Sequence, residues 1–278
     1  MELLIQAAIG FVAGMFGGLL GVGGSIIIIP SLILYLSQTG RYEGTQQHLL
    51  QAAAMICNVF VVAPSVLAHW RARAIMKPVV TLLIPSALVG ILLGVFTSDT
   101  SLFARENGVY LAMVLSGFMV YVAAYNTWRL FKKVDLEKGS DADEKQSPAA
   151  VGAVGLVMGF MGGLLGVGGG AICVPMQQIL LRVPLRRAIA NSAVTIMFVS
   201  SIGAAVKNLR LPSLHGVPVT DSLQLALMLI PTAILGGYLG GKLTHALPRN
   251  VLRLVFIAVM VTMAYLPFTR AWGALAAH

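Results

Sequence analysis

Hydrophobic residues form eight long runs that are separated by short polar segments. The runs cover about 3–36, 49–69, 78–97, 108–131, 151–181, 188–206, 222–245 and 251–268. A helix needs about 20 apolar residues to cross a bilayer, so most runs predict one transmembrane helix each. The pattern therefore predicts an all-α integral membrane protein with about four hydrophobic segments in each half of the chain.

The first and fifth runs are longer than a single crossing requires. A helix of about 33 residues would be ~50 Å long, whereas the hydrocarbon core of a bilayer is ~30 Å thick. Each of these runs is too long for one crossing and too short for two. Two interpretations follow: a re-entrant helical hairpin that enters and leaves on one side, or a broken helix that lies partly among the headgroups.

Both long runs contain the same glycine-rich sequence. Residues 10–24 read GFVAGMFGGLLGVGG and residues 155–169 read GLVMGFMGGLLGVGG, with eleven of fifteen positions identical. Glycines four residues apart, such as Gly10 and Gly14, favour close packing of helices. The GVGG cluster that begins at Gly21 loses this spacing and predicts a break in the helix. Interrupted segments at matching places in two halves are typical of duplicated transporters and indicate their binding sites.

The rest of the chain also divides into two halves. Leu83 to Gly90 in the third run matches Leu229 to Gly236 in the seventh, so the repeat extends well beyond the glycine motif. Between the halves lies KKVDLEKGSDADEKQSP, whose mixed charges are typical of a solvated linker. We expect a first repeat half at 1–131, a charged linker at 132–148 and a second repeat half at 149–278.

Composition supports a membrane protein and argues against several other classes. The chain is 58% hydrophobic and 10% charged, whereas soluble domains carry about 25% charged residues. Its net charge of +9 comes from basic residues that lie almost entirely between the runs. We expect them to orient the protein in the bilayer rather than to bind nucleic acid. Cys57 and Cys173 lie within apolar runs without metal-ligand spacing, so no disulfide, metal site or cofactor is predicted.

The basic residues also distinguish between the two interpretations of the long runs. If all eight runs cross the membrane, the lysines and arginines divide 11 to 8 between its two sides. If the first and fifth runs are re-entrant hairpins, the division becomes 14 to 5, which the positive-inside rule favours. Each half then crosses three times. This arrangement predicts an inverted repeat with both termini in the periplasm and the linker in the cytoplasm.

Several motifs resemble the sulfite exporter TauE/SafE family. They are the paired GGLLGVGG motif followed by Pro30 and Pro175, the His69-Trp70-Arg71 end of the second run, the IPxALxG-like third and seventh runs, and LPRNVLRLVF at 247–256. The resemblance covers nearly the whole chain except the linker. It implies a multi-pass transporter of the bacterial inner membrane that carries small sulfur-containing anions such as sulfite, sulfoacetate, thiosulfate or organosulfonates.

The two glycine breaks form the predicted substrate site. A helix that restarts after a break directs free backbone N–H groups and about half a positive charge toward it. We predict that the two breaks face each other near mid-membrane and bind the anion. The Asn191-Ser192 pair, which is similar to a polar pair of the family, would add donors. The predicted substrate-binding residues are Gly21, Gly23, Gly24, Ser25, Gly166, Gly168, Gly169, Gly170, Asn191 and Ser192.

Other polar residues receive less specific interpretations. Gln51 and Asn58, which lie inside the second run, are expected to form interhelical hydrogen bonds. Lys207, near a segment end, is expected to extend to the interface. The acidic residues all lie in linkers, termini or segment ends. Any pH dependence is therefore expected from substrate protonation or from an interfacial histidine such as His69.

An enzyme is the less favoured functional class. Ser25 beside glycines resembles the nucleophile of an intramembrane serine protease, but the second copy of the motif carries Gly170 there. No catalytic residue is therefore predicted. A transporter of another small solute, a polytopic enzyme and a structural membrane subunit are the alternatives. The identity of the anion, the direction of transport, the coupling ion and the oligomeric state do not follow from the sequence.

Overall fold

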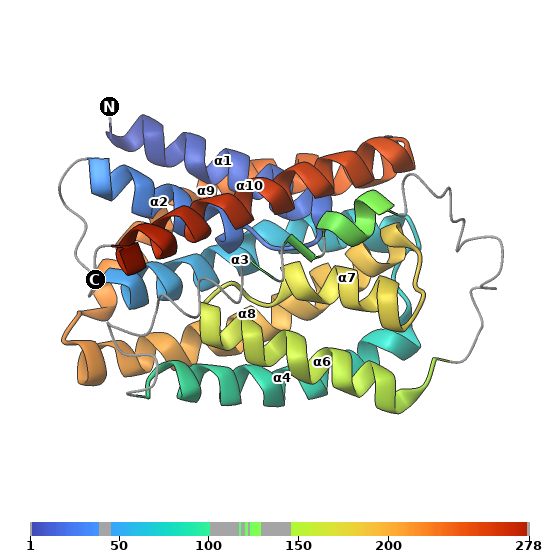
Figure 1. The fold of residues 1–278 in the computed structure, drawn as a ribbon, viewed down its shortest axis with the longest axis horizontal. Helices are drawn as coiled ribbons and strands as arrows, with labels where there is room; N and C mark the ends of the chain where they lie inside the picture. Colours follow the sequence, from blue (N-terminus) through green and yellow to red (C-terminus); the bar gives the residue numbers. More distant parts are fainter. Residues whose placement is uncertain are drawn as a thin grey trace.

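The protein is a bundle of long helices (Figure 1). The computed structural model describes residues 2–38, 46–100, 117, 120–121, 123–128 and 146–276, and these residues contain no strand. Most of the predicted fourth run and most of the predicted linker lie outside them. The helices are α1 (Glu2–Leu20), α2 (Ser25–Gln38), α3 (Gln46–Arg71), α4 (Lys77–Ser98), α6 (Pro148–Leu165), α7 (Gly170–Leu180), α8 (Leu185–His215), α9 (Val219–Ala246) and α10 (Arg249–Ala276).

Six of the described helices are long and apolar enough to cross a membrane. They are α1, α3, α4, α6, α8 and α9. This confirms the prediction of an all-α membrane protein. The helices α2 and α7 are shorter, with 14 and 11 residues, and each is the second part of a long hydrophobic run.

Both long hydrophobic runs break at their glycine clusters and fold back. Gly21–Gly24 separates α1 from α2, and Gly166–Gly169 separates α6 from α7. A Cβ atom at Gly24 would lie 3.6 Å from the carbonyl oxygen of Ala13, so the start of α2 lies beside α1 rather than beyond its end. A Cβ atom at the last glycine of the second cluster would overlap the carbonyl of Met158. Each long run is therefore a helical hairpin, and the alternative of a broken helix that lies partly among the headgroups does not fit, because α2 and α7 fold back along α1 and α6.

The two hairpins enter the bundle from opposite ends. In Figure 1, α1 runs from the left end toward the middle and α2 returns to the left, whereas α6 runs inward from the right end and α7 returns to the right. The start of α1 and the end of α10 both lie at the left end, and the start of α6 lies at the right end. The turns of both hairpins therefore lie inside the bundle.

Each hairpin packs along a long helix from the other half of the chain. The α1 helix lies along α9, and α6 lies along α4. A Cβ atom at Gly18 would lie 2.6 Å from the carbonyl oxygen of Gly237, and one at Gly155 would lie 2.7 Å from that of Leu83. The glycines at these contacts are Gly10, Gly14, Gly18, Gly236 and Gly240 for α1 and α9, and Gly90, Gly94, Gly155, Gly159 and Gly163 for α4 and α6. The repeated glycines thus interlock the two halves.

The α3 and α8 helices pack against each other between the hairpins. The α8 helix is longer than the predicted run at 188–206, because residues 207–215 continue it to His215. This difference matters for Lys207, which lies about two turns inside the helix end rather than at it.

Candidate functional site

The candidate site is built from the two hairpin turns, which we call the first loop (Gly21–Gly24) and the second loop (Gly166–Gly169). Gly21 ends α1 with a φ of +63°, and Gly166 ends α6 with a φ of +71°. Residues with a Cβ atom rarely adopt this left-handed backbone conformation. A glycine in this conformation commonly ends a helix. The repeated glycine motif therefore determines where each hairpin turns.

The first loop touches the start of α7, directly after the second loop. A Cβ atom at Gly170, the first residue of α7, would lie 2.5 Å from the carbonyl oxygen of Val22 in the first loop. The absence of a side chain at Gly170 is what permits this approach. The structure thus places the two predicted breaks in direct contact, and the N-terminal ends of α2 and α7 lie at the same place.

Asn58 on α3 connects the two loops through its side-chain amide. Its Oδ1 accepts a hydrogen bond from the backbone N–H of Ser25 at 2.8 Å, and its Nδ2 donates to the Ser25 hydroxyl at 2.9 Å. The same Nδ2 lies 3.4 Å from the carbonyl oxygen of Val167 in the second loop and 3.4 Å from the hydroxyl oxygen of Ser200 on α8. Asn58 is fully buried. It therefore belongs to the candidate site, although it is not among the predicted site residues.

The sequence contained a weak signal for Asn58. An amide in the middle of an apolar run was interpreted as an ordinary interhelical hydrogen bonder, which is the usual role of such residues. Asn58 does bond between helices, but its partners are the two glycine loops. Only the tertiary structure shows that its hydrogen bonds reach both hairpins.

The Asn191-Ser192 pair divides between two places. The Ser192 hydroxyl donates a hydrogen bond to the carbonyl oxygen of Gly21 at 2.6 Å, so it lies at the first loop. Asn191 instead accepts from the backbone N–H of Met76 at 2.8 Å and donates to Gln177 at 2.9 Å. Ser192 is thus at the candidate site. Asn191 joins α8 to α7 and to the segment before α4.

The second loop has a different set of polar neighbours. A Cβ atom at Gly166 would lie 2.5 Å from the Cβ atom of Gln51 on α3. The Oε1 of Gln51 accepts a hydrogen bond from the Nζ of Lys207 at 2.7 Å. Lys207 is only 5% exposed. The expectation that Lys207 extends to the interface is therefore wrong, and the extra length of α8 is the reason.

The first hairpin is linked to a pair of histidines, one of which lies near the C-terminal end of α3. The Ser65 hydroxyl donates to the carbonyl oxygen of Gly18 at 3.1 Å and lies 3.1 Å from the Nε2 of His69. The Nδ1 of His69 lies 2.8 Å from the Nε2 of His245 on α9. His69 is buried, whereas its neighbour Trp70 is 67% exposed. The expectation that His69 is an interfacial histidine is therefore wrong, and the exposed residue at this place is Trp70.

All ten predicted site residues are buried, so the structure describes a closed site. The Ser25 amide is already bonded to Asn58, and the Gly21 carbonyl to Ser192. Backbone N–H groups, a carboxamide and two hydroxyls are groups that bind anions through hydrogen bonds. The part of the chain that the structure describes contains no group of three or more side chains that could hold a metal ion. For Ser25, the hydrogen-bond partner of the hydroxyl is an amide rather than a histidine.

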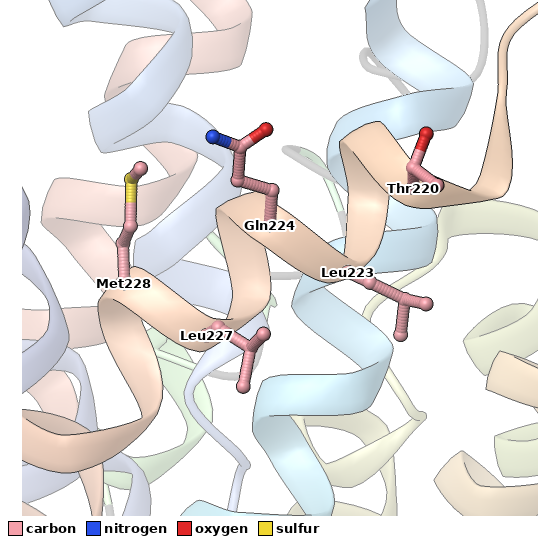
Figure 2. A pocket seen from close by; sticks show the side chains of 5 residues that line it. All are labelled: Thr220, Leu223, Gln224, Leu227 and Met228. Carbon is pink, nitrogen blue, oxygen red and sulfur yellow. The ribbon is translucent and has the colours of Figure 1, made fainter.

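Two surface hollows lie away from the loops. One has a volume of about 470 Å³ and is lined by Thr220, Leu223, Gln224, Leu227 and Met228, all on α9 (Figure 2). Because a single helix face lines it, this hollow suits lipid chains better than a polar solute. The other, of about 330 Å³, lies beside His245 and is lined by Arg71, Lys242, Tyr238 and three apolar residues.

Comparison with known proteins identifies similar membrane transporters. The chain is 29% identical over 276 residues to the probable membrane transporter protein MamO of Paramagnetospirillum magneticum, which covers 91% of this chain and 42% of MamO. It is 26% identical over 276 residues to the probable membrane transporter protein YunE of Bacillus subtilis, covering 95% of this chain and 98% of YunE. The chain thus spans less than half the length of MamO and nearly all of YunE. No solved structure matches the chain.

The family comparison agrees with the motifs in the sequence. Residues 6–266 match the family described as sulfite exporter TauE/SafE. The match includes both glycine hairpins and the other described helices up to the end of α9. It confirms the resemblance that the paired glycine motif and the LPRNVLRLVF segment indicated, and the chain belongs to the sulfite exporter TauE/SafE family of membrane transporters.

Proposed function

We propose that the protein is a secondary transporter of small sulfur-containing anions, namely sulfite, sulfoacetate, thiosulfate or an organosulfonate, in the bacterial inner membrane. The observation that carries the proposal is the junction of the two glycine hairpins, which come from different halves of the chain: the first loop contacts Gly170 of α7, and Asn58 bonds both hairpins. The name of the family supports the class of substrate. The all-helical bundle with six apolar helices supports the location in a membrane.

The proposed binding site is the junction of the two loops. The positive ends of α2 and α7 meet there, and missing side chains let an anion approach the backbone. In the closed state the Oδ1 of Asn58 accepts the N–H of Ser25. When the site opens, an anion oxygen takes the place of that Oδ1. Rotation of the Asn58 amide then directs its Nδ2 toward the anion.

The proposed mechanism is alternating access between two inverted halves. Two observations support it. The hairpins enter from opposite ends of the bundle (Figure 1), and each hairpin packs along a helix of the other half, α1 along α9 and α6 along α4. In this arrangement fourteen of the nineteen lysines and arginines lie on one side, which assigns the 132–148 linker to the cytoplasm. Both termini are then periplasmic.

A proteoliposome uptake screen tests this function. Purified protein is reconstituted and assayed with sulfite, thiosulfate, sulfoacetate and taurine, with sulfate and an uncharged amino acid as comparisons. We expect saturable uptake of at least one of the first four. Gly169→Val should abolish that uptake while the protein still inserts, and Gly152→Ala should retain it because no atom lies within 4 Å of the added Cβ. Uptake of the amino acid without uptake of any sulfur anion would favour the alternative of another small solute.

A further inference from the structure

Lys207 is a buried cation whose closest partners are neutral. Its Nζ donates hydrogen bonds to the Oε1 of Gln51 at 2.7 Å and to the hydroxyl of Ser98 at 3.1 Å. The neighbouring Asp99 carboxylate instead forms an ion pair with the Nε of Arg210 at 2.7 Å. Among these described groups two are positive and one is negative, so one positive charge is left over.

A buried charge of this kind needs a reason. An ionisable side chain inside a membrane-spanning helix is costly, and it usually marks a substrate path or pairs with an opposite charge. Pairing explains Lys207 only in part, because the Asp99 carboxylate reaches it through the Ser98 hydroxyl and at the same time forms the ion pair with Arg210. An ammonium has three N–H donors, and Gln51 and Ser98 account for two of them. A small oxyanion has several acceptor oxygens and the charge that this place lacks.

Lys207 is also close to the second loop. The Gln51 side chain that accepts its hydrogen bond is the one that covers Gly166. A single side chain therefore separates the ammonium from the proposed binding junction. Ser98 is the last residue of α4. Lys207 thus lies between the second loop and the end of the bundle at which α4 ends.

The internal repeat contains a matching arrangement around the first loop. Ile189 covers Gly21 as Gln51 covers Gly166, and 189 − 51 = 138. Subtracting 138 from 207 gives position 69, so His69 on α3 is the counterpart of Lys207 on α8. His69 is likewise buried and is linked to a hairpin through one polar residue, Ser65.

Both copies of the repeat therefore place a side chain that can carry positive charge beside the end of a glycine hairpin. A residue that only fills space would not need this chemistry, and an apolar residue would be less costly in the membrane. In Figure 1, α3 ends at the right end of the bundle and α4 ends at the left end. His69 lies two residues before the end of α3, and Lys207 bonds Ser98 at the end of α4, so the two basic groups lie toward opposite ends.

We propose that the Lys207 ammonium is an anion-binding group on the path between the second loop and the end of the bundle at which α4 ends. An oxyanion with a sulfite, thiosulfate or sulfonate group displaces Ser98 or Gln51 from the ammonium. Its oxygens then accept hydrogen bonds from the N–H groups of Lys207. The inference rests on the proposed function, because it assigns a second binding position to the same transported anion. In the proposed topology this position faces the periplasm.

The test measures stabilisation by anions, which does not require transport. Thermal unfolding of the purified protein is followed while sodium thiosulfate replaces sodium gluconate at constant ionic strength. For the unmodified protein we expect a saturable rise in the unfolding temperature. Lys207→Met should raise the half-saturating concentration at least tenfold. The matched control is Lys77→Met, which removes an exposed lysine of α4 and should leave the value unchanged.

Asp99→Asn separates a binding role from a structural one. If Lys207 only stabilises the bundle, disruption of the Asp99 and Arg210 pair should be as harmful as disruption of Lys207. If the cluster binds an anion, removal of the negative charge should lower the half-saturating concentration or leave it unchanged. Lys207→Gln is a second variant that keeps a hydrogen-bond donor. It provides the same comparison if the methionine variant does not fold.

The outcomes distinguish this inference from the proposed function. Equal half-saturating concentrations in the unmodified protein and both Lys207 variants overturn the Lys207 site, even if uptake of sulfur anions is measured. Absence of any anion-dependent stabilisation overturns it as well. Stabilisation that depends on Lys207, in a protein whose liposomes take up no sulfur anion, supports the binding site and contradicts the transport function.

Discussion

The Nδ1 of His69 and the Nε2 of His245 lie 2.8 Å apart and join α3 to α9 by a hydrogen bond between two imidazole rings. One of these nitrogens must accept the proton that the other donates, so at least one ring is neutral while the bond exists. The contact closes the space between two helices that belong to different halves. His245 also borders the hollow that Arg71 and Lys242 line.

Acidification should weaken this contact. When both imidazoles are protonated, all four ring nitrogens are donors and the two positive charges repel each other. We expect the initial rate of thiosulfate uptake to rise as the pH falls below about 6.5, because a buried pair of imidazoles takes up its second proton less readily than a free histidine does. Thiosulfate is the suitable substrate because its own charge does not change in this range.

His245→Gln should remove this pH dependence, because glutamine can donate or accept the same hydrogen bond but does not titrate. The comparison is His48→Gln, which changes a histidine at the start of α3 and should keep the dependence. A pH profile that is the same in His245→Gln as in the unmodified protein would exclude the histidine pair as its source.

The close packing of α4 and α6 makes a second prediction. A Cβ atom at Gly159 would overlap the carbonyl of Ala87, whereas one at Gly152 on the same helix would meet nothing within 4 Å. Gly159→Ala should lower the free energy of unfolding by about 1–3 kcal/mol because the helices must separate. Gly152→Ala should leave it unchanged or raise it by up to about 1 kcal/mol through better helix propensity. Thermal unfolding in detergent measures both, and equal stabilities would contradict the packing.

Equivalent glycines of the two loops should differ in how well they tolerate replacement by alanine. Gly169 has a φ of +77° and lies against the backbone of Met158, so an alanine there is both strained and crowded. Gly24 has no positive φ, and its added Cβ would lie 3.0 Å from a methyl group of Val61 that can move. We expect Gly169→Ala to abolish uptake and Gly24→Ala to reduce it less than tenfold. Similar losses in both variants would show that the backbone conformation of the second loop is not the reason.

Removal of the Asn58 amide should affect both stability and transport. Asn58→Ala leaves the Ser25 N–H without its acceptor, and a buried unsatisfied group costs about 1–3 kcal/mol. We expect lower thermal stability together with loss of uptake. Asn250→Ala, at an exposed position near the start of α10, is the control and should change neither. Normal uptake by Asn58→Ala would remove this residue from the proposed site.

The proposed topology can be tested by labelling in intact cells. Cys57 and Cys173 are both buried, so they can be replaced to give a background without reactive thiols. We expect a cysteine at Gln146 to be protected from a membrane-impermeant maleimide, and a cysteine added after His278 to react. Labelling of Gln146 in intact cells, with its reactivity unchanged on lysis, would contradict the inverted arrangement.

The sequence by itself determined the class of the protein, the extents of the described helices apart from the C-terminal ends of α8 and α10, and the place of the two breaks. These features are local. Apolar runs of bilayer length make helices, and glycines with left-handed backbone conformations at Gly21 and Gly166 end them. The family could also be recognised from the repeated motif, because both copies keep the same glycines.

The tertiary structure alone decided which residues surround the loops. Glycines four apart indicate close packing but not the partner, and the partner of each hairpin proved to be a helix of the opposite half. Asn58 and Ser192 reach the loops while Asn191 does not, because a helix turns successive side chains in different directions. Lys207 is buried because α8 continues for two turns beyond it. Such relationships depend on how separate helices lie against each other, and the spacing of residues within one helix does not contain them.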